Sequence, residues 1–231
     1  MTNPSQNKTH ASCFSLVTQR LSSRDDDIHG CTFLPLAILR TARLRNNIFL
    51  IMVNQRMYAD VKNRASRDFL TQVFNRRTVT AKITKYLQKL PESKISFALI
   101  LLDIDNFKKI NDFYGHHIGD LVLQETSTIL KSQLNQGELM GRWGGEEFLI
   151  FLPSCSTSEA CDRAEWLRQK VAEQSIDYQN NQKAIGCTIS IGVVTTTSGH
   201  RTLDELIKQA DIALYQAKNQ GRNQVKYCPL P

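Results

Sequence analysis

The spacing of hydrophobic residues changes at about residue 68, and from there apolar runs of strand length alternate with segments that repeat at the helical period. The nearly continuous apolar run Ile95–Asp103 predicts a buried strand, and Ala184–Thr195 predicts a second long one. The remaining spacing predicts a short edge strand at Gln224–Tyr227 and helices over Asn75–Leu90, Gly119–Leu134, Ser158–Gln174 and Thr202–Asn219, the last with Thr202 as its N-cap.

A glycine pair separates two further strands. Leu139–Trp143 and Glu147–Leu152 are joined across Gly144-Gly145, which is typical of a tight β-hairpin. Strands and helices that alternate in this way predict an α/β (α+β) sandwich around a mixed sheet flanked by helices. The chain of 231 residues is long enough for one such domain with its own core and an additional segment.

The chain before this domain divides into two parts. Residues 1–34 are polar and are expected to be disordered, residues 35–67 form a predicted helical linker or dimerisation segment, and the sandwich occupies residues 68–231. Within the linker, apolar or small residues recur every seven positions at Leu44, Ile51, Tyr58 and Ala65. This stripe favours self-association, but an amphipathic helix packed on its own domain explains it equally well, because Asn47 and Asn54 interrupt the second seam position.

The positions of the charged residues argue against a membrane span and against a nucleic acid partner. Arg40, Arg43 and Arg45 interrupt the apolar stretch 33–53, and each is costly at the centre of a bilayer. Residues 1–67 carry ten Lys or Arg against four Asp, whereas residues 68–231 carry nineteen against eighteen acids. A domain that neutralises many phosphates needs its own basic surface, so only a membrane-surface role for residues 36–56 stays open.

The cysteines and the N-terminus indicate the compartment. The six cysteines are scattered and form no C-x-x-C pair, so neither a zinc cluster nor a disulfide framework is suggested. The first thirty residues lack the charged start and apolar run of a signal peptide. We therefore expect reduced thiols and a cytoplasmic location.

Four acidic residues stand at the ends of predicted strands. Asp103 and Asp105 end the apolar run, and Glu146 and Glu147 follow the glycine pair. Clustered carboxylates suit Mg²⁺, which also keeps waters and substrate phosphates, and two such ions can drive phosphoryl transfer. Any one of these acids alone is better explained as an exposed surface charge, but four at two neighbouring sites favour a metal site.

The glycine pair adds a second argument. Without a Cβ, Gly144 and Gly145 can take positive φ and let a nucleotide lie against the backbone. Ordinary hairpins use the same pair, so its weight comes from the two acids that follow it.

Several motifs, in order, resemble the GGDEF family of diguanylate cyclases, and the resemblance covers about Asp68 to Tyr227. They are Asp68–Arg77 (DFLTQVFNRR), Asp103–Asp112 (DIDNFKKIND), Gly115–Asp120 (GHHIGD), Arg142–Phe148 (RWGGEEF), Ser190–Gly192 (SIG) and Ala210–Asn223 (ADIALYQAKNQGRN). Gly144–Phe148 is the GGEEF variant of the family signature.

The resemblance implies a polymerase-palm or nucleotidyl-cyclase-like fold, a GTP substrate and a role for each matching residue. Asp103, the Ile104 carbonyl and Glu147 would hold Mg²⁺ or Mn²⁺, with two ions in each half-site, and Glu146 would be the second metal ligand or the base at the 3′-hydroxyl. Asn111 and Asp120 would bind the guanine edge. The phosphates would be bound by Phe107, Lys108, Lys218 and Arg222, with Gly144 and Gly145 lying along the nucleotide.

The same resemblance implies that two domains, each with one GTP, must face each other to make cyclic di-GMP, so a homodimer is expected. For Lys218 and Arg222 taken alone, a solvated helix end is the simpler interpretation. The alternative function is a catalytically inactive GGDEF-like module that binds GTP or cyclic di-GMP. The input signal cannot be deduced from residues 1–34, so either a separate sensory partner regulates the chain or the chain is part of a longer one.

Three positions need separate comment. Gln72 replaces a turn glycine of the family motif, and we expect a local backbone adjustment. Asn135 and Glu138 replace the Arg and Asp of the family's product-inhibition site, so we expect no feedback through that site. His116 and His117 are adjacent and generally point apart, so we predict loop residues near the nucleotide rather than metal ligands.

Overall fold

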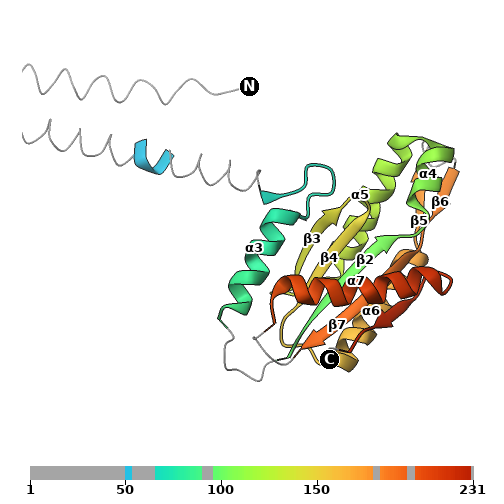
Figure 1. The fold of residues 1–231 in the computed structure, drawn as a ribbon. Coiled ribbons are helices and arrows are strands. Elements are labelled where there is room, and N and C mark those ends of the chain that lie inside the picture. The colour runs from blue at the N-terminus through green and yellow to red at the C-terminus, as the bar shows by residue number, and fades with distance from the viewer. Residues whose placement is uncertain (1–49, 54–65, 90–95, 179–182, 197–200, 230–231) are drawn as a thin grey trace, which may run out of the picture. The chain divides into compact units, whose positions relative to one another are not determined.

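The computed structural model describes residues 50–53, 66–89, 96–178, 183–196 and 201–229 (Figure 1). The chain divides into two compact units, Met1–Tyr58 and Ala59–Pro231. In the first, residues 50–53 are helical and exposed. The predictions for residues 1–34 and most of 35–67, including the heptad stripe, lie outside the described residues, and the boundaries at 35 and 68 stay predictions. No helix within the described ranges is long and apolar enough to cross a bilayer.

The second unit is built on a mixed sheet with the strand order β1-β3-β4-β2-β7-β8. Its central strands pair antiparallel, and β1 and β8 pair parallel at the two edges. These strands are β1 (Phe74–Asn75), β2 (Phe97–Ile104), β3 (Leu139–Gly144), β4 (Glu147–Leu152), β7 (Ile189–Thr196) and β8 (Val225–Tyr227), and a separate two-stranded sheet is formed by β5 (Ser175–Tyr178) and β6 (Lys183–Gly186).

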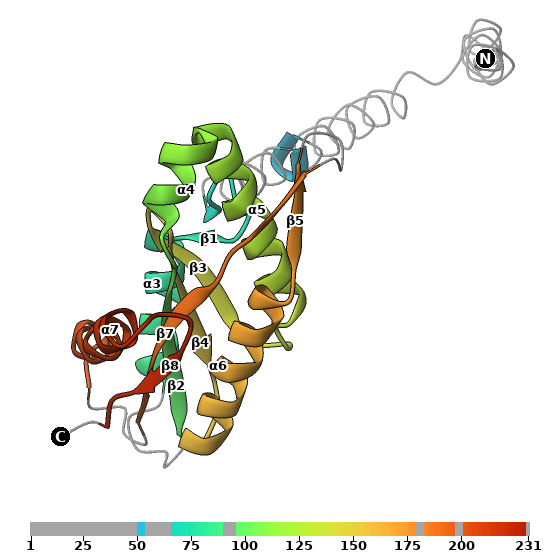
Figure 2. The ribbon, with the colours of Figure 1, turned by 90° about the vertical axis from the view of Figure 1, so that its right-hand side faces the viewer.

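Helices cover both faces of this sheet (Figure 2). On one face lie α3 (Arg76–Leu87) and α7 (Leu203–Asn219), and on the other lie α5 (His116–Ser132) and α6 (Thr157–Ala172). The short helix α4 (Phe107–Tyr114) follows the end of β2. Thr202 caps α7 as predicted, its side chain accepting a hydrogen bond from the Glu205 amide. The predicted sandwich of a mixed sheet and flanking helices is confirmed.

Strand β2 is covered by helices on both faces, which explains its nearly continuous apolar sequence. All eight of its residues are buried, since helices cover both faces. Ala98, Ile100, Leu102 and Ile104 join the core that includes α5 and α6, whereas Phe97, Leu99 and Leu101 join the core that includes α3 and α7. Burying each large side chain contributes roughly 1.5–3 kcal/mol. Asp103 continues the second series, so its side chain emerges on the face covered by α7.

A close approach between α7 and β7 depends on Gly192. A Cβ at this position would lie 2.1 Å from the carbonyl oxygen of Ala210 and 2.5 Å from the amide nitrogen of Leu214. Both atoms belong to the backbone of α7 and cannot rotate away. Gly192 therefore sets the depth at which α7, and with it Lys218, packs on the sheet.

Two predictions differ from the structure, and β1, α4 and β5 were not predicted at all. The segment 184–195 is two strands, because β6 ends at Gly186 and β7 begins at Ile189. His116 and His117 are the first residues of α5 rather than loop residues, since the chain turns at Gly115, which has φ +86°. Gln72 has φ +57°, a left-handed conformation that favours glycine, and the adjustment expected at this position stays a prediction.

Candidate active site

Asp103 and Glu147 lie side by side on the face of the sheet covered by α7. They are direct register partners of β2 and β4, and side chains at such antiparallel positions point to the same face. Glu146 directly precedes Glu147, and its carbonyl oxygen accepts a hydrogen bond from the amide of Ile104 at 3.4 Å. This bond joins the hairpin turn to the end of β2. The structure thus brings together Asp103, Ile104, Glu146 and Glu147, as the sequence predicted.

Lys218 joins this group from α7. Its Nζ lies 2.7 Å from Oδ2 of Asp103, whose side chain is only 7% exposed. Burial raises the pKa of Asp103 to about 6, and the charges of Glu146 and Glu147 add to this, although Lys218 acts in the opposite direction. Ionised Asp103 is therefore less stable here than an exposed carboxylate, and a bound cation would offset that cost.

The hairpin turn consists of Gly145 and Glu146, because β3 extends through Gly144. The predicted positive φ of the glycine pair is wrong, since neither Gly144 nor Gly145 has it, while the nucleotide expected along this backbone stays a prediction. A Cβ on Gly144 would come within 3.0 Å of Oε2 of Glu147, so this glycine leaves room for the acid. A Cβ on Gly145 would meet nothing within 4 Å, so the turn offers open space along its backbone.

Asp105 has a structural role that the sequence did not reveal. Its two oxygens accept hydrogen bonds from Oγ1 of Thr188 at 2.7 Å, Oγ of Ser190 at 2.6 Å and the amide of Asn223 at 3.0 Å. The side chain is buried and its oxygens are occupied, so its predicted place in a four-acid metal cluster is not supported. It instead anchors the turn after α7.

That turn carries Arg222. Gly221, Arg222 and Asn223 all have positive φ, and the Arg222 amide bonds to the carbonyl of Ala217. The side chain of Arg222 is exposed, at the end of the helix that carries Lys218. Because it holds the amide of Asn223, Asp105 helps to place Lys218 and Arg222, two of the four predicted phosphate ligands.

Two predicted guanine ligands are also brought together. The side chain of Asn111, on α4, lies against Gly119 on α5, where a Cβ would be 1.8 Å from Oδ1 of Asn111. Asp120 follows Gly119 and is exposed. Only glycine at position 119 leaves space for the Asn111 amide beside Asp120.

The beginning of α4 supplies backbone donors. Asn106 takes a left-handed conformation and turns the chain from β2 into α4, which starts at Phe107 and Lys108. The first amides of a helix have no partner within the helix and carry the positive end of its dipole. Phe107 is buried and Lys108 is exposed, so the ring fixes the helix while the ammonium is available to an anion.

These residues can hold Mg²⁺ only in part. In the portion of the chain that is described, no three His, Cys, Asp or Glu side chains are grouped so that they could hold a metal by themselves. Mg²⁺ is usually bound through one or two carboxylates together with waters and substrate phosphates. Asp103 and Glu147 on one face fit that requirement.

The positions of the replaced inhibition motif form a closed network. Asn135 donates from its backbone amide and side chain to the Glu138 carboxylate at 2.8 and 3.2 Å. Nη2 of Arg163 lies 3.3 Å from the same carboxylate and also donates to the carbonyl of Gln133. The Glu138 carboxylate is thus already bonded within the domain.

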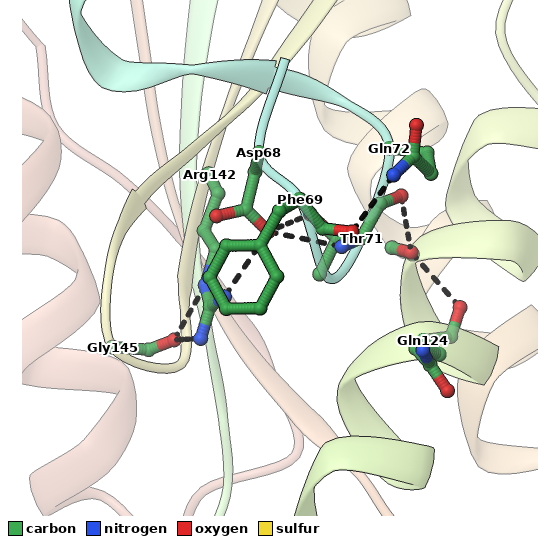
Figure 3. Close-up of polar contacts among 8 residues, drawn as sticks. Asp68, Phe69, Thr71, Gln72, Gln124, Arg142 and Gly145 are labelled. Atoms are coloured by element: carbon green, nitrogen blue, oxygen red, sulfur yellow. Dashed lines mark hydrogen bonds and ion pairs between the residues drawn. The ribbon is translucent and has the colours of Figure 1, made fainter. Parts of the chain in front are cut away.

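Two further residues were quoted within motifs but given no role by the sequence. They are Asp68 and Arg142: Arg142 donates to the carbonyl of Gly145 and to the carboxylate of Asp68, and so contacts the turn of the β3–β4 hairpin (Figure 3). Each of the two residues begins a family motif, which was the only signal in the sequence. The contact between them is seen only in the fold.

Comparison with known proteins agrees with this geometry. The family model described as "Diguanylate cyclase, GGDEF domain" matches residues 65–224. The chain is 42% identical over 134 residues to diguanylate cyclase A of Treponema denticola, covering 58% of this chain and 36% of that protein. It is 40% identical over 177 residues to diguanylate cyclase DgcM of Escherichia coli K12, covering 76% of this chain and 41% of that protein. It therefore spans about two fifths or less of the length of these relatives.

Solved structures show the same fold. The coiled coil and GGDEF domain of DgcB from Caulobacter crescentus, in complex with c-di-GMP, superposes with a TM-score of 0.76 at 25% identity, covering 81% of this chain and 98% of that one. Diguanylate cyclase SiaD of Pseudomonas aeruginosa, in complex with its activator SiaC, superposes with a TM-score of 0.68 at 28% identity. The match covers 95% of this chain and 84% of that one. With the family model matching residues 65–224, this chain belongs to the GGDEF family of diguanylate cyclase domains.

Proposed function

We propose that this chain is a diguanylate cyclase, which condenses two GTP molecules into cyclic di-GMP and two pyrophosphates. The observation that carries the proposal is the pairing of Asp103 with Glu147 on one face of the sheet, beside Lys218. Two carboxylates and an ammonium at one strand edge suit a metal-bound triphosphate. None of the acids that the family signature requires is replaced, which disfavours an inactive binding module.

Each half of the reaction would proceed in the same way. The 3′-oxygen of one GTP attacks the α-phosphorus of the other, a P–O bond forms, and the bond to the leaving pyrophosphate breaks. The hydroxyl proton passes to a base, for which Glu146 in the hairpin turn is the proposed acceptor. A bound divalent metal would supply charge to the phosphate oxygens and the attacking hydroxyl.

The remaining residues would bind the nucleotide. Asp103, the Ile104 carbonyl and Glu147 would hold the metal, with Glu146 as a further ligand when it is not the base. The Asp120 carboxylate would accept hydrogen bonds from the N1–H and the amino group of guanine, which adenine does not offer together, and the Asn111 amide would also bind the guanine edge. The phosphates would contact Lys218, Arg222, Lys108 and the first amides of α4, beginning at Phe107, while the nucleotide lies along Gly144 and Gly145.

Cyclic di-GMP contains two phosphodiester bonds, and two domains that each hold one GTP are needed to form them. The active form is therefore proposed to be a homodimer. Opposed domains would hold the two GTP molecules in attacking geometry, and such orientation is worth up to ~7–11 kcal/mol of a reaction barrier. SiaD was solved with a separate activator protein, SiaC, which supports a separate regulatory partner here. A cytoplasmic location stays a prediction; the described cysteines, Cys155, Cys161, Cys187 and Cys228, are free thiols.

Incubation of the purified chain with GTP and Mg²⁺, followed by chromatographic and mass analysis of products, tests the proposal. Cyclic di-GMP and pyrophosphate in a 1:2 ratio are expected for the natural chain. Asp103→Ala and Glu146→Ala should reduce the rate by at least about a hundredfold, because they remove metal and base functions. GTP binding without any product would instead support the inactive module, and full activity of both variants would overturn the metal assignment.

A further inference from the structure

Arg142 connects the turn of the β3–β4 hairpin to the first residues of the domain. Its Nε and Nη2 donate to the carbonyl oxygen of Gly145 at 2.9 and 2.8 Å, and its Nη1 lies 3.1 Å from Oδ1 of Asp68 (Figure 3). Both partners of the ion pair are largely buried, with side chains 18% and 16% exposed. A guanidinium forms such planar, multiple contacts, whereas a lysine ammonium does not.

Asp68 is itself held firmly. Its Oδ1 accepts from the amide and the hydroxyl of Thr71 at 2.9 and 2.7 Å. Burial raises the pKa of Asp68, but the hydrogen bonds from Thr71 and the charge of Arg142 outweigh it, so the pKa lies below its usual value. Asp68 is therefore an ionised, fixed partner for Arg142 at neutral pH.

The turn that contains Asp68 is anchored to α5. The buried hydroxyl of Ser127 lies 3.1 Å from the carbonyl oxygen of Thr71 and 2.9 Å from that of Gln124 on its own helix, so its one proton is shared between the two (Figure 3). Gln72 closes the turn in its left-handed conformation, with Nε2 donating to the carbonyl of Phe69 at 2.7 Å. The chain Ser127–Thr71–Asp68–Arg142–Gly145 thus links the helix that carries Asp120 to the hairpin that carries Glu146.

The hairpin needs support at this point. The regular ladder between β3 and β4 is broken by a bulge between Arg142 and Gly144. Backbone bonds alone therefore fix the turn less well than in an unbroken hairpin, and the two bonds from Arg142 to Gly145 act where the ladder is irregular. Glu146 and Glu147 follow directly, so a shift of the turn moves both carboxylates relative to Asp103.

We propose that Arg142 and Asp68 are positioning residues for the cyclase reaction. They act on the turn at Gly145 and thereby hold Glu146 and Glu147 against Asp103. The proposal rests on the proposed function, because it assigns these acids to catalysis. Residues 66–72, at the start of the domain, would then help to fix the conformation of the β3–β4 hairpin.

The test uses Arg142→Lys and Asp68→Asn, which keep the size and, for Asn, an oxygen acceptor. Each variant should lower kcat about tenfold or more while KM for GTP changes less than about threefold, because misplaced groups slow the chemical step more than binding. The double variant should be no slower than the worse single one, since both act through one contact. Backbone hydrogen exchange of residues 144–148 should become faster in each variant without nucleotide.

Glu173→Gln is the matched control, since it removes one carboxylate from the Lys170–Glu173 ion pair on α6, away from the hairpin. It should leave kcat and exchange of residues 144–148 unchanged. Additive losses in the double variant, a rise in KM at constant kcat, or unchanged exchange of the hairpin would each overturn the proposal. If Arg142→Lys does not fold, Asp68→Asn decides alone. If the natural chain makes no cyclic di-GMP, the proposed function fails, and the exchange measurement still decides whether these residues hold the turn.

Discussion

The ammonium of Lys218 lies 2.7 Å from Oδ2 of Asp103. The acid proposed to bind Mg²⁺ therefore has a cationic partner from α7. Because Asp103 is buried and Lys218 is 31% exposed, solvent screens this pair less than a surface ion pair. Metal and lysine therefore compete for Asp103, and the triphosphate would give Lys218 a new partner once GTP binds.

Replacement of Lys218 separates these two roles. Lys218→Met should tighten Mn²⁺ binding to the nucleotide-free protein about fivefold, which corresponds to ~1 kcal/mol of lost competition. The same variant should bind a non-hydrolysable GTP analogue more weakly, because a phosphate partner is lost. Titration followed by electron paramagnetic resonance and by calorimetry measures the two effects. Lys208→Met, on an exposed position of the same helix, is the control. Weaker Mn²⁺ binding by Lys218→Met would contradict the competition.

Asp103 should destabilise the fold above its raised pKa. The pKa is about 6 in the folded chain against an ordinary 3.8, so folding favours the protonated carboxyl. That stabilisation is complete below pH ~4 and is lost as the pH rises through ~6. Asp103→Asn should therefore increase the free energy of unfolding by roughly 1–3 kcal/mol at pH 8 and by little at pH 4.

Urea unfolding of both proteins in metal-free buffer at several pH values measures this difference. Comparison at each pH cancels the other titrating groups. The variant should also be inactive, which separates stability from function at this position. A larger gain at pH 4 than at pH 8 would show that burial does not raise the pKa of Asp103.

Gly119 should control nucleotide affinity through Asn111. Gly119→Ala places a Cβ where Oδ1 of Asn111 now lies, and a side-chain end can rotate away. Alanine also favours a helix interior over glycine by ~1 kcal/mol, which offsets the local crowding. We expect unchanged stability within ~1 kcal/mol and a KM for GTP raised about tenfold, the effect of losing one or two hydrogen bonds.

The control for this substitution is Gly186→Ala, where an added Cβ meets nothing within 4 Å. Steady-state kinetics and thermal unfolding of both variants give the two quantities. If KM for GTP is unchanged in Gly119→Ala, Asn111 does not contribute to GTP binding.

Product inhibition should be absent at Asn135 and Glu138. The Glu138 carboxylate bonds Asn135 and Arg163 inside the domain, and Asn135 lacks the charged fork that binds phosphate. Initial rates should stay unchanged at nanomolar to micromolar added cyclic di-GMP. The double substitution Asn135→Arg with Glu138→Asp restores the family residues and should introduce inhibition. Inhibition of the natural chain, abolished by Arg163→Gln, would show that this network binds product.

The sequence alone determined the long helices and the central strands, though not β1, α4 or the separate β5–β6 sheet, and it determined most of the acidic edge. The run 95–103 predicted a buried strand because a strand covered on both faces must be apolar throughout, and β2 is such a strand. Thr202 marked the start of α7 in the sequence, because an N-cap is a hydrogen bond between residues three positions apart. The family motifs placed Asp103, Glu146 and Glu147, and the fold pairs Asp103 with Glu147.

The tertiary structure alone decided which of these groups share a contact. It assigned Asp105 to Thr188, Ser190 and Asn223 rather than to a metal, and it joined Asp68 to Arg142 across 74 positions of sequence. Spacing cannot reveal such pairs, because they depend on sheet register and on how closely α7 approaches β7 at Gly192. Local hydrogen bonds and burial periods are written along the chain, whereas contacts between distant segments exist only once the sheet and its helices have packed.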